Sequence, residues 1–207
     1  MTPQIHDLAR TLIGRAENRK RFVVAIAGPP GAGKSTMAEH LAEALTGHGE
    51  TAKILPMDGF HMDDGILLQK GLLSRKGAPE TFDIRGFLDI VRAVGAGKEE
   101  VLVPVFDRSR ELAIAAARHI ALSTRFVLVE GNYLLLDQDG WAQLEGLFDY
   151  SILISPPVAT LESRLMQRWL DLGFDEEVAR AKTQGNDLLN GALVRERSRQ
   201  ADIVLSV

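Results

Sequence analysis

A glycine-rich segment, GPPGAGKST from Gly28 to Thr36, carries the clearest chemistry in this sequence. It matches the pattern G-x-x-x-x-G-K-[ST], whose glycines let backbone N–H groups turn inward around phosphate oxygens. Lys34 can reach the β- and γ-phosphates of a nucleoside triphosphate, and the Ser35 hydroxyl can hold Mg²⁺. A solvated lysine on a glycine-rich turn is the alternative, but an apolar run before the motif and a helical pattern after it favour a phosphate loop. The predicted nucleotide-binding residues are Gly28, Gly31, Ala32, Gly33, Lys34, Ser35 and Thr36.

Two acidic residues directly follow apolar runs, Asp58 in PMDGFH and Glu130 in VEGN. If both runs are strands of one parallel sheet, both acids lie at the edge where ligands bind. One acid can anchor Mg²⁺ through its water shell, and the other can orient an attacking hydroxyl and accept its proton. We assign the proton to Asp58 and the metal to Ser35 and Glu130. The reverse assignment stays open, as does a plain Asp-Gly turn at Asp58.

Other polar residues are weaker candidates. Arg164 and Arg168 share one helix face at i, i+4 spacing and can grip phosphate oxygens, although a solvated basic face has the same pattern. His61 can touch an acceptor or pack beside the loop. Arg108, next to Asp107, would suit an anionic acceptor or lie free on the surface. The tryptophans at 141 and 169 stand among apolar residues and are predicted to be core.

The composition is that of an average globular domain, and it removes several classes of function. The 207 residues are 45% apolar and 25% charged, and the net charge of −4 argues against a nucleic-acid binder. The absence of cysteine excludes disulfides, thiolate metal sites and a cysteine nucleophile. Because no apolar run is long enough to span a membrane and no signal-peptide pattern is present, we expect one cytoplasmic domain over residues 1–207 without membrane insertion.

Strand and helix patterns alternate along the chain. Buried strands are predicted at 22–27, 53–57, 101–106, 126–129, 151–154 and 203–206. Helices are predicted at 3–18, 34–45, 66–73, 84–91, 158–172, 174–182 and 188–197. The segment 112–122 is ambiguous, because its alanines favour helix and its surroundings favour strands. This alternation predicts a parallel α/β sheet covered on both faces, and an exposed first helix could form a homodimer interface.

A series of motifs occurs in a fixed order: GPPGAGKST, PMDGFHMDD (56–64), KGAPETFD (76–83), VPVFDRSRE (103–111), VLVEGNYLLLD (127–137) and ND (186–187). Together they resemble the uridine kinase, pantothenate kinase and phosphoribulokinase branch of the P-loop kinases. Among these, the sequence is most similar to bacterial proteins called fructose transport system kinases. The resemblance extends from about residue 22 to the end of the chain.

The resemblance implies a three-layer P-loop fold with a parallel sheet of strand order 2-3-1-4-5 and a small β-hairpin near residues 100–122. It implies that Asp58 is the base and that Glu130 is the acid near the metal. Asp83 and Asp107 match positions near the acceptor pocket, where we also place His61 and Arg108. A lid of residues 158–185, bearing Arg164 and Arg168, would close over ATP.

The predicted function is transfer of the γ-phosphate of ATP, with Mg²⁺, to a hydroxyl of a small molecule such as a sugar. Lys34, Asp58, Arg164 and Arg168 are the predicted catalytic residues. A nucleoside kinase for uridine or cytidine is the alternative, but Phe106 stands where uridine kinases carry a tyrosine. A regulatory or transport-associated ATPase is a further alternative. The sequence does not identify the acceptor, the reacting hydroxyl or a preference for ATP over GTP.

Overall fold

The computed structural model describes residues 3–206 and has a five-stranded parallel sheet at its centre. The strands are β1 (Phe22–Ala27), β2 (Ala52–Pro56), β5 (Phe126–Gly131), β6 (Tyr150–Ile154) and β7 (Ile203–Leu205). Their order across the sheet is β2-β5-β1-β6-β7. Numbered within this sheet alone, that order is 2-3-1-4-5, as the family resemblance implied. β1 and β5 are buried along their whole length, which explains their unbroken apolar runs.

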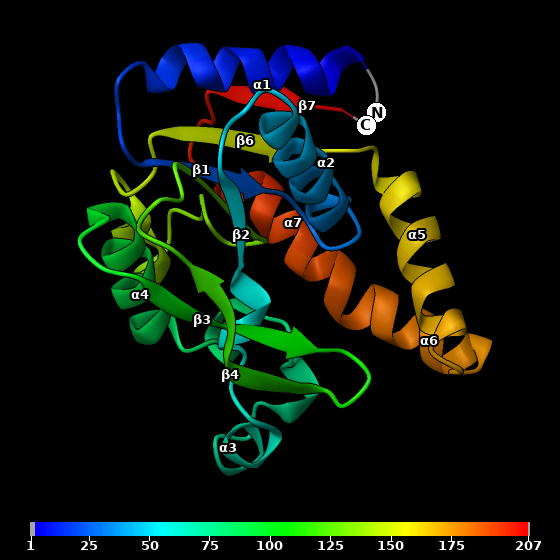
Figure 1. Ribbon diagram of the computed structural model, residues 1–207. Helices are drawn as coiled ribbons and strands as arrows, with labels where there is room; N and C mark the ends of the chain where they lie inside the picture. Colours follow the sequence, from blue (N-terminus) through cyan, green and yellow to red (C-terminus); the bar gives the residue numbers. More distant parts are fainter. Residues whose placement is uncertain (1–2, 207) are drawn as a thin grey trace.

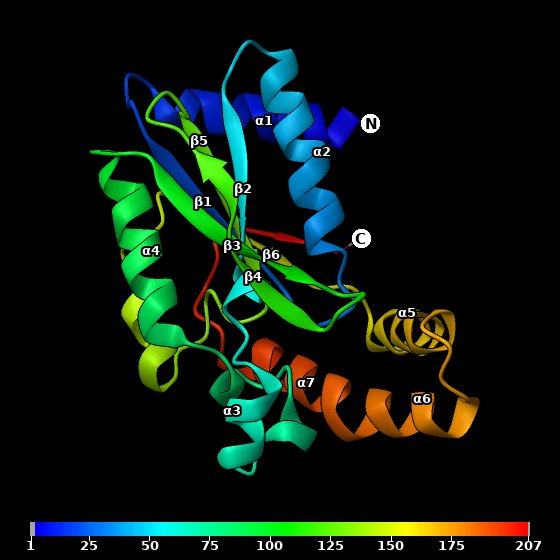
Figure 2. The same cartoon turned by 60° about the horizontal axis from the view of Figure 1, so that its bottom comes forward.

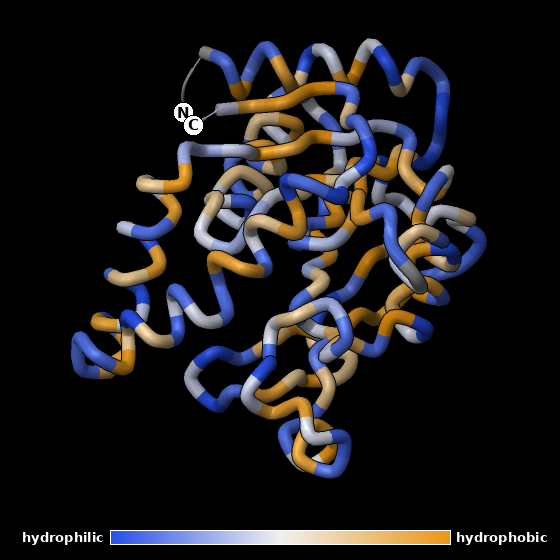
Figure 3. Tube along the Cα trace, turned by 180° about the vertical axis from the view of Figure 1, so that it is seen from behind, coloured by the Kyte–Doolittle hydropathy of each residue, from blue (hydrophilic) through white to orange (hydrophobic). Residues whose placement is uncertain are grey.

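Helices cover both faces of the sheet (Figures 1 and 2). On one face lie α1 (Pro3–Ala16) and α2 (Lys34–Gly47), which pack on alternate residues of β1 such as Val24 and Ile26. On the other lie α4 (Ile84–Ala96) and α7 (Leu188–Arg197), which pack on Val23 and Ala25. Coloured by hydropathy, the strands are mostly hydrophobic and the outer helices alternate (Figure 3). The α/β prediction is therefore confirmed.

The first helix is amphipathic, and its apolar side belongs to the chain's own core. Ile5, Leu8, Ala9 and Leu12 are all buried against α2 and the sheet. That side is not available to a second copy of the chain. Residues on the opposite side, such as Arg10 and Thr11, are exposed, and a homodimer through this helix stays a prediction. In residues 3–206 no helix combines the length and the apolarity that crossing a membrane would take.

A separate antiparallel hairpin consists of β3 (Val101–Asp107) and β4 (Leu112–Ile120). β4 is the segment that the alanines left ambiguous, and the structure confirms the strand that the resemblance implied. Its register shifts between Val103 and Val105, around Pro104, which has no N–H to donate to the ladder. The hairpin packs on η1 (Met57–Phe60), the 3₁₀ turn that follows β2, so the predicted strand end at residue 57 is one residue too long.

Two further segments extend from the sheet. The α3 segment, residues 62–83, contains α3 (Asp64–Gln69) and two short 3₁₀ turns, η2 (Leu73–Arg75) and η3 (Pro79–Thr81). The segment predicted to be the lid, residues 158–185 and called the lid below, contains α5 (Val158–Asp171) and α6 (Glu176–Lys182). α6 continues through a wider π-helical turn, η5 (Thr183–Asp187), into α7. In Figure 1 the lid runs out from the sheet and α7 brings the chain back beneath it. A fourth 3₁₀ segment, η4 (Asp139–Leu144), packs on α4.

Candidate active site

The phosphate loop joins β1 to α2. Gly28 has φ 157°, and a Cβ placed on it would lie 2.4 Å from the carbonyl oxygen of Ile154, so only glycine fits there. Gly33 has φ 89° and forms the left-handed N-terminal cap of α2. The loop therefore directs the N-terminus of a 14-residue helix, with its free N–H groups, toward the space outside the sheet.

Lys34 is buried beneath this loop, with only 8% of its surface exposed. Its Nζ donates to the carbonyl oxygen of Pro29 at 2.9 Å. Burial lowers the pKa of Lys34 to about 8, while the negative charges of Glu130 and Asp58 act in the opposite direction. A backbone contact within the loop thus holds the Lys34 ammonium group in place.

Glu130 lies at the carboxyl end of β5, between the ends of β1 and β2. It is 7% exposed, and burial together with the charge of Asp58 raises its pKa to about 7. Lys34 and a hydrogen bond from Ser35 partly oppose this shift. A buried carboxylate beside a hydroxyl at the end of a phosphate loop is an oxygen-only donor set, which suits Mg²⁺. No group of three or more His, Cys, Asp or Glu side chains suited to a metal occurs in residues 3–206, so most remaining ligands would be water and phosphate oxygens.

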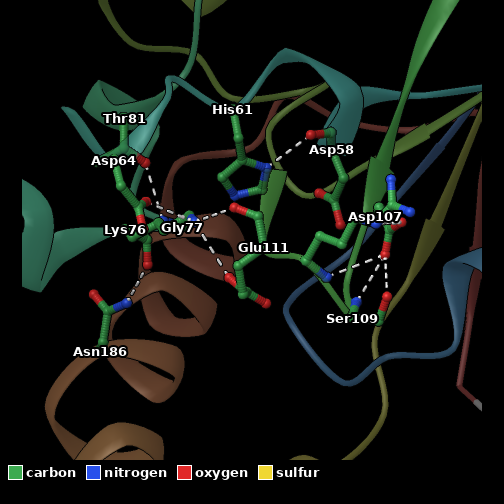
Figure 4. Close-up of polar contacts among 11 residues, drawn as sticks. Asp58, His61, Asp64, Lys76, Gly77, Thr81, Asp107, Ser109, Glu111 and Asn186 are labelled. Carbon is green, nitrogen blue, oxygen red and sulfur yellow. Dashed lines mark hydrogen bonds and ion pairs between the residues drawn. The ribbon is translucent and has the colours of Figure 1, made fainter. Parts of the chain in front are cut away.

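Asp58 lies in η1, directly after β2, with a quarter of its side chain exposed. Arg108, at the end of the hairpin, donates a hydrogen bond to its carboxylate. The Asp58 carbonyl oxygen lies 2.8 Å from Nδ1 of His61, which contacts it across the same turn (Figure 4). Asp58 and Glu130 thus both lie at the carboxyl edge of the sheet, where the sequence analysis expected them, and their roles stay predictions.

His61 lies between two aromatic rings. Its ring centroid is 4.1 Å from that of Phe82 and 4.7 Å from that of Phe106. Burial lowers the pKa of His61 further than Asp58 raises it, so the imidazole is neutral at pH 7. His61 and Phe106, whose rings are inclined by 40° to each other, therefore form an aromatic wall next to Asp58.

These residues surround a cavity of about 1100 Å³ that begins at the phosphate loop and passes Asp58. Its other walls come from the α3 segment, the hairpin and the lid. The predicted site residues that line it are Gly31, Gly33, Lys34, Ser35, Thr36, Asp58, His61, Arg108, Glu130 and Arg168. Ten positions from five separate stretches of the chain thus meet in one space.

Five predicted residues do not line this cavity. Gly28 and Ala32 are buried within the loop, and Arg164 lies 3.5 Å from the Gly31 carbonyl oxygen. Asp83 caps α4 by accepting from the Gly86 N–H at 3.0 Å. Asp107 accepts from Ser109 Oγ at 2.6 Å and stabilises the hairpin turn, and these hydrogen bonds lower its pKa (Figure 4). Asp83 and Asp107 thus each have a local structural role, which is an alternative to the acceptor-binding role predicted for them.

Several cavity residues were missed by the sequence analysis. The Lys76 ammonium group forms ion pairs with Asp64 at 2.8 Å and with Glu111 at 3.2 Å. The backbone carbonyl oxygen of Lys76 accepts a hydrogen bond from Asn186 Nδ2 at 2.9 Å (Figure 4). These contacts tie the α3 segment to the hairpin and to the turn before α7. The only available signal was that all four residues lie inside the quoted motifs.

Trp169 corrects a further prediction. It lines the cavity from the lid instead of filling the core, because its Nε1 donates to Asp187 at 2.7 Å and Lys182 Nζ lies 4.6 Å from its ring. Trp141, by contrast, is buried in the core as predicted. Both tryptophans stand among apolar residues in the sequence, and only the fold separates them.

Known proteins resemble this chain over nearly its full length, although no protein-family model matches it. It is 35% identical to "Uncharacterized protein YggC" of Escherichia coli over 99% of this chain and 85% of that protein. It is 31% identical to "Putative uridine kinase C227.14" of Schizosaccharomyces pombe over 96% of this chain and 88% of that protein. It is also 30% identical to the pantothenate kinase of Leifsonia xyli, of which it spans about half, 54%.

Among solved structures, one from Silicibacter sp. TM1040 is described as a "putative fructose transport system kinase". It shares 44% identity with this chain, covers 99% of both chains and superposes with a TM-score of 0.93. The similarity therefore includes the lid, the hairpin and the α3 segment as well as the sheet.

Proposed function

Because this chain belongs to the uridine kinase and pantothenate kinase branch of the P-loop kinases, and is an ATP-dependent small-molecule kinase, we propose that its acceptor is a sugar or a related polyol. One observation carries this proposal: beyond Asp58, the cavity has an aromatic wall of His61 and Phe106, and it is also lined by a rim of amides and charged groups. The C–H face of a sugar ring packs on such a wall, and its hydroxyls bond to such a rim. The relative from Silicibacter, described in words that include fructose, supports the same class.

In the proposed reaction, the phosphate loop and Lys34 hold the β- and γ-phosphates of ATP. The acceptor hydroxyl attacks the γ-phosphorus and forms a new O–P bond, while the bond to the β,γ-bridging oxygen breaks and ADP leaves with that electron pair. Asp58 orients the hydroxyl and receives its proton. Arg168, and Arg164 after a movement of the lid, contribute positive charge to the transferring group.

Ser35 and Glu130 would hold Mg²⁺, which supplies charge neutralisation on the phosphates when bound. For this, Glu130 must be ionised. Its raised pKa works against ionisation at pH 7, and the positive charge of a bound metal would favour the ionised form. Residues 158–185 act as the lid of a single kinase domain that spans residues 1–207. Lid closure limits access of water and thus ATP hydrolysis without acceptor.

The test is ADP formation from Mg-ATP across a panel of acceptors: fructose, other sugars and their phosphates, uridine, cytidine, pantothenate and glycerate. We expect one class to raise the rate, and Asp58→Asn to reduce that rate by about 10²–10⁴-fold with ATP binding kept. Asp89→Asn, on the exposed side of α4, is the matched control. Normal turnover by Asp58→Asn would overturn the role of Asp58. A rate that no acceptor changes would favour the regulatory ATPase, and a response to uridine or cytidine alone would favour the nucleoside kinase.

A further inference from the structure

Arg108 is paired with the one carboxylate that the proposed reaction needs free. It donates to Asp58 from the hairpin, with about half of its own side chain exposed. While this pair is intact, Asp58 shares its charge with a guanidinium instead of a substrate hydroxyl. Orientation of a hydroxyl by Asp58 therefore requires this pair to open.

The other acids near Arg108 have contacts of their own, and Glu130 accepts a hydrogen bond from Ser35. Lys76 already holds Asp64 and Glu111, and Asp187 accepts from Trp169. Arg168 lies near enough for the positive charge of Arg108, together with burial, to lower its pKa. Two guanidinium groups at close range are unfavourable unless an anion lies between or beside them. When Asp58 turns to a hydroxyl, an anion from outside the protein is therefore a favourable new partner for Arg108.

The position of Arg108 indicates which part of a bound ligand supplies that anion. Its guanidinium carbon lies 5.9 Å from the centre of the Phe106 ring, and Lys76 Nζ lies 5.3 Å from the same ring. The aromatic wall against which the acceptor packs is thus flanked by two cations. A planar guanidinium binds carboxylate or phosphate oxygens in a bidentate manner.

We propose that Arg108 selects acceptors that carry an oxyanion, a phosphate or a carboxylate, in addition to the reacting hydroxyl. The oxyanion takes the place of Asp58 on Arg108 and so releases the carboxylate for the hydroxyl. This inference rests on the proposed kinase reaction and narrows its acceptor class to phosphorylated sugars and hydroxy acids. With ATP alone, Arg108 would stay paired with Asp58, so Asp58 would not activate water as an acceptor.

The competing possibility is that Arg108 binds the γ-phosphate of ATP, since its charge also reaches Lys34. The two possibilities differ in a measurable ratio. If Arg108 serves ATP, its removal lowers turnover of neutral and anionic acceptors alike. If it serves the acceptor, its removal lowers only the advantage of the anionic acceptor over its neutral counterpart.

The experiment compares matched pairs, fructose with fructose 1-phosphate and glycerol with glycerate, in wild type, Arg108→Ala and Arg108→Lys. We expect a higher kcat/KM for the anionic member in the wild type. The ratio of anionic to neutral kcat/KM should fall by about 10–100-fold in Arg108→Ala and by less in Arg108→Lys, which keeps the charge and loses the planar fork. Comparing the phosphate with the carboxylate pair identifies which oxyanion is used.

Arg110→Ala is the matched control, because Arg110 lies on the same turn, is 70% exposed and pairs with Asp107 at 3.7 Å outside the cavity. It should keep the wild-type ratio. A wild type that prefers neutral members, or a ratio unchanged by Arg108→Ala, overturns the proposal.

Binding measured by calorimetry separates this proposal from the kinase assignment. If no pair is turned over, the proposed acceptor class fails, and the affinities still decide the role of Arg108. Tighter binding of the anionic member to wild type than to Arg108→Ala supports the proposal, and equal binding contradicts it.

Discussion

The two ends of the cavity differ in how the chain builds them. The phosphate end is one continuous segment, Gly28–Thr36, supported by a buried strand and a 14-residue helix. The acceptor end is assembled from η1, the α3 segment, the hairpin and the turn before α7, which meet through side chains such as Lys76. A backbone cradle tolerates little variation, whereas an assembly of side chains can change its ligand by substitution. Substitutions at the side-chain end can therefore change which acceptor binds, while the backbone loop keeps its binding of phosphate.

The largest expected effect breaks the phosphate end. Lys34→Ala removes the buried cation that balances the phosphates, so kcat should fall by about 10³-fold or more. Because burial disfavours the charge of Lys34 in the folded protein, the melting temperature should not fall. Steady-state kinetics and thermal unfolding check both parts. Lys53→Ala, on an exposed position of β2, is the control, and a Lys34→Ala enzyme with near-normal kcat would contradict the assignment.

The two tryptophans test the contrast between core and cavity wall. Trp141→Ala opens the core and should cost about 3–5 kcal/mol of unfolding free energy. Trp169→Ala should cost less than about 1 kcal/mol but raise a substrate KM by roughly 10-fold, because the wall and the orienting bond to Asp187 are lost. Denaturant unfolding and kinetics on both variants check this. Equal losses of stability would contradict the different placements.

Glu130, the buried acid between the two ends of the cavity, should make the stability of the fold depend on pH. Because the folded-state pKa of Glu130 is raised from 4.5 to about 7, the folded protein binds a proton more tightly than the unfolded chain there. The wild type should therefore lose stability as the pH rises through this range, by about 2 kcal/mol. Glu130→Gln cannot ionise and should avoid this loss, and we expect it to reduce transfer strongly as well. Thermal unfolding of both proteins at pH 5 and pH 8 checks this. If the stability of Glu130→Gln relative to wild type does not increase from pH 5 to pH 8, the prediction is wrong.

The smallest expected effect concerns Asp83. Its carboxylate caps α4, so Asp83→Ala should cost about 1 kcal/mol of stability and leave the acceptor KM unchanged. Asp83→Asn and Asp83→Ser, which can cap, should restore most of that loss. A large rise in KM in Asp83→Asn at normal stability would instead place this residue in the acceptor site, as the family resemblance implies.

Much of the fold and the phosphate end could be predicted because the signals are local. A six-residue apolar run before glycine, and a helical pattern after Lys34, report burial and turn geometry directly. The acids Asp58 and Glu130 were found because strand ends share one edge of a parallel sheet.

The acceptor end resisted prediction because its order depends on contacts distant in sequence. Lys76 and Asn186 meet across 110 positions, and nothing around either residue indicates the other. Trp169 was misplaced because an apolar neighbourhood does not reveal which side of a helix faces a cavity. β4 was ambiguous because most of its residues are exposed, so their alanines carry no burial pattern.

The π-helical turn at Thr183–Asp187 has a consequence for helical phase. It adds residues to one turn between α6 and α7, while Gly191, farther along, lies against Pro29 of the phosphate loop. The angular setting of α6 relative to α7 thus depends on the number of residues in this turn as well as on side-chain contacts such as Trp169–Asp187. Deleting one residue from the turn would leave every polar group of the site in the sequence, yet rotate α6 by about 100° about its axis. The lid would then present Lys182 and its neighbours in a different direction, with α7 still seated on the loop.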